Sequence, residues 1–130
     1  MTVSGDVIFC DDIRKEDNGK AILIGVYTGA LVLEQLPVDI LLSAWIRVSG
    51  LDKGKHDVSV EFHSPGGKTF SIGAEAHIVD PENVDSIMLS GFPLHIGETG
   101  KISCKFKVSN EEYELGNLPV TVADEPKLDD

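Results

Sequence analysis

Apolar and polar residues alternate along this chain in short runs, which recur at a pitch of about a dozen residues and are separated by Gly, Pro, Asn or Asp. A period of two places successive side chains on opposite faces of a strand, and many such strands with turns between them are typical of a sandwich. We therefore predict an all-β fold, a single-domain antiparallel β-sandwich of about eight strands. The expected strands cover residues 6–10, 21–27, 40–48, 58–63, 69–79, 87–96, 101–108 and 113–122, with a short apolar piece at 30–33.

The clearest turn signal is Asn18-Gly19, which stands between two apolar runs. Both residues tolerate the positive φ that a type I′ turn requires, so the pair predicts a hairpin between the first two strands. Two later features predict interruptions. Pro37 cannot donate to a ladder and ends the piece at 30–33, and Gly91 with Pro93 is expected to break the strand at 87–96.

The alternation also predicts which side chains form the core. In the run 101–108, apolar residues occupy the even positions and three lysines occupy odd ones, a pattern that discourages edge pairing on the exposed face. The same reading of the other strands gives a predicted core. It consists of Ile24, Ile46, Val60, Phe62, Phe70, Ile72, Ile102 and Phe106.

Two strands, 21–27 and 40–48, are apolar on both faces, which indicates that both faces are covered. We predict that the residues on the face away from the core bind a partner, and that the simplest partner is a second copy of the chain, giving a homo-oligomer. These predicted partner-binding residues are Leu23, Tyr27, Leu41 and Trp45. The alternative is that residues 30–33 fold back and cover them.

The length of 130 residues predicts one domain, assigned to residues 1–122, followed by an acidic disordered tail at 123–130. The net charge of −11 argues against nucleic acid and against an anionic membrane surface as partners, and it favours basic ones. No secretory signal or membrane-spanning run is recognised, so we expect a cytoplasmic protein in which Cys10 and Cys104 are reduced, with Cys104 buried.

Acidic residues crowd the loops that an alternating antiparallel chain would place at one pole, where we count 12 of the 22 carboxylates. Such a pole can hold Ca²⁺ through hard oxygen ligands, and the residues considered for it are Asp11, Asp12, Asp80, Glu82 and Asp85. The structural interpretation of the first of these loops is that Asp12 caps its own turn and that Arg14 pairs with Asp12 or Glu16. We favour that interpretation, because exposed turns are often acidic and Arg–carboxylate pairs are common in them. The acidic loops also show no fixed metal-ligand spacing.

No nucleophile–base constellation and no cofactor motif can be argued from the residues, so we predict that the protein is not an enzyme and uses no cofactor. His63 and His77 fall on strands that Pro65-Gly66-Gly67 joins, and they are expected to face each other as a polar cross-strand pair.

The opening of the chain contains the pattern Asp11-Asp12-x-Arg14-x-Glu16, then Gly19-Lys20, then Leu23-Ile24-Gly25-x-Tyr27, and Leu36-Pro37. In these residues the chain resembles a family of small uncharacterised bacterial and phage proteins. The resemblance implies a β-sandwich and brings no catalytic residue with it. The function predicted from the sequence is a non-enzymatic protein-binding or assembly module. The alternative is a Ca²⁺-dependent ligand-binding β-sandwich that uses an acidic loop pole.

Overall fold

The computed structural model describes residues 2–123 and contains nine strands. Within this range there is no helix long and apolar enough to cross a membrane. Of the predicted acidic tail at 123–130, all but Ala123 lies outside the described residues. The strands are β1 (Ser4–Lys15), β2 (Ala21–Val26), β3 (Leu31–Leu33), β4 (Val38–Ser49), β5 (Gly54–His63), β6 (Thr69–Ile78), β7 (Asp85–Ile96), β8 (Gly100–Val108) and β9 (Glu111–Val122).

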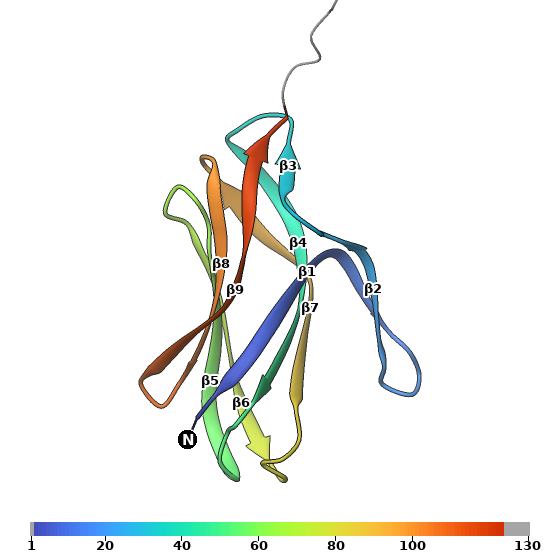
Figure 1. Cartoon of the computed structure of the whole chain (residues 1–130), viewed down its shortest axis with the longest axis vertical. Helices are drawn as coiled ribbons and strands as arrows, with labels where there is room; N and C mark the ends of the chain where they lie inside the picture. Colours follow the sequence, from blue (N-terminus) through green and yellow to red (C-terminus); the bar gives the residue numbers. More distant parts are fainter. Residues whose placement is uncertain (1, 124–130) are drawn as a thin grey trace, which may run out of the picture.

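The strands form two sheets that pack face to face, which confirms the predicted β-sandwich (Figure 1). Sheet A has four strands in the order β2-β1-β4-β7, and sheet B has five in the order β3-β9-β8-β5-β6. Every pairing is antiparallel except that of β3 with β9, which is parallel. The apolar piece at 30–33 therefore contributes a ninth strand and joins sheet B, where Leu31 is buried, instead of covering strands of sheet A.

The core lies between the sheets and follows the predicted alternation in β5 and β8. Val60, Phe62, Ile102 and Phe106 are at most 2% exposed. Phe62 stacks on Phe92 of β7, with ring centroids 4.4 Å apart. Aromatic side chains of both sheets thus meet at the centre of the sandwich, where they bury a large apolar area.

The prediction that Ile24 and Ile72 belong to the core is wrong. Both residues lie on edge strands, where a neighbouring strand covers one side only. Ile24 of β2 is 47% exposed and Ile72 of β6 is 41% exposed. β2 turns the other row of side chains inward, because Leu23 lies opposite the buried Ile13 and Tyr27 packs against the core. Ile72 does lie on the inner side of β6, opposite the buried Val60, but no strand of sheet A covers it completely.

The first turn also differs from the prediction. The Gly19 amide donates to the Glu16 oxygen and only Gly19 has a positive φ, so the loop has three residues and is not a type I′ turn. The two successive positive φ values that a type I′ turn needs occur instead at Ser109 and Asn110, between β8 and β9. The hairpin of β1 and β2 extends away from the rest of the sandwich (Figure 1). We call it the β1–β2 arm.

A buried serine joins three strands of sheet A. Ser43 of β4 is 0% exposed, and its hydroxyl donates to the Asp11 oxygen of β1 at 3.1 Å. The same hydroxyl accepts the Gly91 amide of β7 at 3.0 Å. The register of β4 with β7 shifts at this point, so β7 continues past Gly91 and Pro93 with a bulge where a break was predicted.

Candidate binding surface

The structure divides the four predicted partner-binding residues between the two faces of sheet A. Leu23 lies opposite Ile13, and Tyr27 packs against the core, so both belong to the inner side. Leu41 and Trp45 lie on the outer face, because Leu42, Ala44 and Ile46 between and beside them are buried in the core. Leu41 is 70% exposed and Trp45 is half-buried.

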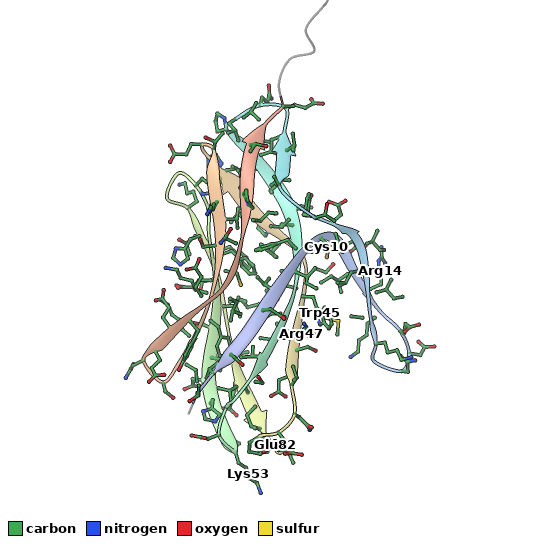
Figure 2. All side chains as sticks on the ribbon, in the orientation of Figure 1. Cys10, Arg14, Trp45, Arg47, Lys53 and Glu82 are labelled. Carbon is green, nitrogen blue, oxygen red and sulfur yellow. The ribbon has the colours of Figure 1, made fainter. Side chains whose placement is uncertain are left out.

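The outer face around Trp45 combines apolar and charged groups. Ile8 and Met88 lie beside Trp45 in register, one on each neighbouring strand. The Arg47 guanidinium carbon is 5.0 Å from the centroid of the indole ring, within cation–π distance (Figure 2). Asp6 holds this guanidinium through two hydrogen bonds of 3.0 and 2.7 Å. The buried Trp45 Nε1 has no hydrogen-bond partner among the described residues.

Sequence reasoning missed the residues that extend this face along β2. Ile22, Ile24 and Val26 are between 43% and 47% exposed. The register places Val26 opposite Cys10, and Cys10 opposite Ser43 of β4, so the β2 row continues the outer face of sheet A. We refer to Ile22, Ile24, Val26, Leu41 and Trp45 as the outer apolar surface. Both rows of β2 are apolar, so the sequence alone does not show that the row of Ile22, Ile24 and Val26 is the exposed one.

The acidic residues at the base of the arm are engaged within the chain. The Tyr27 hydroxyl donates to Asp11 Oδ1 at 2.6 Å, and burial together with this carboxylate raises the pKa of Tyr27 to about 12. Asp12 accepts hydrogen bonds from Ser90 Oγ at 2.9 Å and from Arg14 Nε at 2.8 Å. These two bonds lower the pKa of the Asp12 carboxyl, and the predicted pairing of Arg14 with Asp12 is confirmed.

The other acidic residues considered for a cation site lie elsewhere. Asp80 and Glu82 belong to the connection between β6 and β7, where Asp80 Oδ1 accepts the Glu82 amide, and Asp85 is the first residue of β7. Figure 2 shows Glu82 at the lower end of the sandwich and Arg14 on the arm. Within residues 2–123, no three His, Cys, Asp or Glu side chains form a group that could hold a metal ion. The predicted acidic pole is therefore spread over separate loops.

The outer face of sheet B carries a cluster of ion pairs. Lys107 Nζ lies 2.8 Å from Glu61 Oε2, and Lys105 Nζ lies 3.0 Å from Glu112 Oε1. The bond with Lys107 lowers the pKa of Glu61 and raises that of Lys107, and Lys105 lowers the pKa of Glu112. The lysine row of this strand lies on the outer face as predicted; Lys105 and Lys107 are half-buried and pair with carboxylates of neighbouring strands.

This cluster makes stability depend on pH. Because the pKa of folded Glu61 lies below its ordinary value of 4.5, its contribution is present above that value and is lost as the pH falls through the folded-state pKa. We expect Glu61→Gln to destabilise the protein at neutral pH and to make no difference in strong acid. Urea unfolding across a pH series measures this, with Glu98→Gln, outside the cluster, as control. A destabilisation by Glu61→Gln that is constant with pH contradicts the assignment.

The histidines do not form the predicted cross-strand pair. His63 lies opposite Thr69 and His77 lies opposite Lys55, at the two ends of the β5–β6 ladder. His95 Nδ1 lies 2.6 Å from Asp39 Oδ1, and the buried Ser64 is close to this pair in the fold. The Ser64 hydroxyl, however, donates to the main-chain oxygen of His95 at 2.5 Å, so it is not oriented by the imidazole as a nucleophile would be.

Cys104 is buried, as predicted, and Cys10 is buried as well. They lie in different sheets, on β8 and β1, and both are free thiols. Burial raises the pKa of Cys104 to about 12. A thiol with such a pKa is a poor nucleophile, so Cys104 acts as a small apolar core residue.

The comparisons with known proteins concern nearly the whole sandwich. No curated protein matches the chain. A family model described as a family of unknown function, DUF6941, matches residues 6–123, from near the start of β1 to just beyond the end of β9. This range contains eight of the nine strands in full, all of β1 except its first two residues, and all the residues of the outer apolar surface. The chain therefore belongs to the DUF6941 family.

Proposed function

We propose that this protein is a non-enzymatic binding module that associates with protein through the outer apolar surface, and in the first place with a second copy of itself. The observation that carries the proposal is the composition of β2. This edge strand reads Ala-Ile-Leu-Ile-Gly-Val and contains no charged residue and no proline. An exposed apolar edge strand without such residues is a site of strand pairing with another chain.

The other edge strands are protected in ways that β2 is not. β3 has three residues, β6 carries Glu75 and His77, and β7 begins with Asp85 and contains Pro93. Short length, charge and proline are the devices by which edge strands avoid pairing. The contrast supports β2 as the edge at which the protein associates.

A second copy fits this edge because a two-fold dimer needs only one self-complementary surface. Antiparallel pairing of β2 with its symmetry mate would join the two four-stranded sheets. The rows Ile22, Ile24 and Val26 of both copies would then meet on one face and cover each other. Leu41 and Trp45 lie on the same face of sheet A, on β4, with β1 between them and this edge.

Single substitutions on this surface test the proposal. Light scattering at about 100 µM protein is expected to give a dimer, because this concentration lies well above the dissociation constant of about 1 µM that a modest interface gives. Ile24→Glu and Val26→Glu are each expected to give a monomer, because either change places an unpaired charge in the contact. Val79→Glu is the matched control, because Val79 is 71% exposed but lies outside the outer apolar surface.

Two results would count against the proposal. A wild-type protein that is monomeric at this concentration rejects association through β2. A dimer that persists in both glutamate variants places the interface on another surface. Far-UV circular dichroism of each variant verifies that the sandwich is folded.

The alternative function, Ca²⁺-dependent ligand binding, is tested by the same preparation. A thermal melt with and without Ca²⁺ detects a bound ion as a rise in Tm, because a ligand that binds only the folded state stabilises it. The dispersed positions of Asp11, Asp12, Asp80, Glu82 and Asp85 favour the protein-binding proposal over this one. The bacterial and phage origin of the relatives, and the motif at Asp11 to Tyr27, stay predictions.

A further inference from the structure

A second binding site is suggested by the side of the sandwich opposite the arm, where β6 and β7 form the edges of the two sheets. The inner row of β6 is fixed by its register with β5, in which Ile72 and Ala74 lie opposite the buried Val60 and Val58. Ile72 is nevertheless 41% exposed, and Ala74 is exposed as well. Core-facing positions of β6 are therefore left in contact with solvent.

A groove runs between the sheets at this place. It has a volume of about 250 Å³, with buried Val58 and Phe106 at its floor and Ala74, Ala76 and Ile87 on its walls. The groove exists because β6 presents small alanines where the neighbouring strands present larger side chains. A closed apolar cavity of about 150 Å³ suffices to bind benzene, so this groove has room for a large apolar side chain. We call it the β6–β7 groove.

The strands that flank the groove also offer main-chain hydrogen bonds. Among residues 2–123, β7 pairs only with β4 and β6 pairs only with β5, so each has a free edge. Pro93 interrupts the edge of β7 farther along the strand, beyond the residues that line the groove, and Asp85 opposes pairing with an acidic strand but not with a basic one. An extended peptide that adds to a sheet edge gains main-chain hydrogen bonds and places alternate side chains into pockets. A strand added beside β7 would continue sheet A over the uncovered inner row of β6.

The rim of the groove is acidic. Glu75 and Asp85 line it, and Asp80 and Glu82 lie in the loop that connects β6 to β7. Lys55 offsets part of this charge through a distant pair with Glu75, at 3.9 Å. Such a rim attracts positive charge and repels negative groups, among them the carboxylate of a fatty acid.

We propose that the β6–β7 groove binds an extended basic segment of a partner protein, which adds as a strand to the free edge of β7 and inserts an apolar side chain against Ala74 and Ala76. The apolar lining selects one large side chain, and the acidic rim selects the lysines or arginines on either side of it. This site is separate from the outer apolar surface, so the two proposals stand or fall independently.

The test uses a defined probe, a nonapeptide in which lysine alternates with valine and carries a central phenylalanine. It is titrated into the full chain and followed by amide NMR signals. We expect shifts concentrated at residues of β6 and β7, among them Ala74 and Ile87. A peptide of the same composition whose apolar residues are grouped at one end is expected to bind at least about tenfold more weakly.

Variants separate filling of the groove from general charge attraction. Ala74→Leu fills the groove and is expected to weaken binding by about tenfold or more. Ser71→Leu adds comparable bulk to the opposite face of the same strand and should leave the affinity unchanged. Asp85→Asn changes only the rim charge and should also weaken binding, which keeps the test decisive if Ala74→Leu does not fold.

Several outcomes overturn the proposal. The first two are equal binding of both peptides and amide shifts confined to strands other than β6 and β7. The third is an unchanged affinity in the variant Ala74→Leu or, if that variant does not fold, in Asp85→Asn. The fourth is the absence of binding up to about 1 mM peptide. Dodecanoate is the remaining probe. If it shifts the same amide signals and displaces the peptide, the groove is a site for aliphatic ligands and the proposal fails.

Discussion

Replacement of Phe62 by alanine is expected to destabilise the protein by about 3–5 kcal/mol. Phe62 is 0% exposed, stacks on Phe92 at 4.4 Å and meets the edge of Phe9 at 6.1 Å. The variant loses the burial of the ring and its aromatic contacts, and it leaves a cavity that three strands from both sheets enclose. Urea unfolding measures the loss as a lower midpoint with an unchanged m-value.

The control for this prediction is Phe70→Ala. Phe70 also stacks on Phe92, with centroids 5.1 Å apart, but it lies on the edge strand β6 and is only partly buried. Its loss should cost distinctly less, because solvent can enter the space that the ring leaves. A cost below about 1 kcal/mol for Phe62→Ala would show that Phe62 is not at the centre of the core.

Replacement of Gly50 by alanine is expected to have the second largest effect, a loss of more than about 2 kcal/mol. Gly50 connects β4 to β5 with φ of +92°, a conformation that side chains disfavour. A Cβ at this position would lie 1.9 Å from the main-chain oxygen of Thr2. The first residues of the chain would have to move, and the buried Val3 would move with them.

Gly19→Ala separates the two causes. Gly19 has a similar φ of +90°, but a Cβ there would meet no atom within 4 Å. It should therefore show only the conformational cost of about 1–2 kcal/mol. Equal losses at both positions, measured by urea unfolding, would mean that the start of the chain does not pack against Gly50.

The sequence predicts the two-layer fold well where one face of a strand is polar. In β5 and β8 the apolar row is unambiguous, and Val60, Phe62, Ile102 and Phe106 are buried. In β2 both rows are apolar, so alternation gives no orientation. The orientation follows from the register of the first hairpin, which places Leu23 opposite the buried Ile13. That register goes with a three-residue loop, whereas the Asn-Gly signal predicts a two-residue turn.

The candidate surface was predictable only in part for the same reason. The prediction that Leu41 and Trp45 lie away from the core is confirmed, because Leu42, Ala44 and Ile46 of the same strand are buried in the core. Leu23 and Tyr27 were assigned to that face although they lie on the inner side, and Ile24 was assigned to the core although it is exposed. Contacts between distant residues, such as Ser43 with Asp11 and Gly91, leave no local signal in the sequence.

The pairing of β3 with β9 has a consequence for how the chain folds during synthesis. β3 begins at Leu31, and its partner strand β9 ends at Val122. The Leu33 oxygen also accepts the amide of Ala123, at 2.8 Å. Contacts between segments this far apart form late, because the loop between them must close first. During synthesis on the ribosome, β3 can therefore join sheet B only after β9 has emerged.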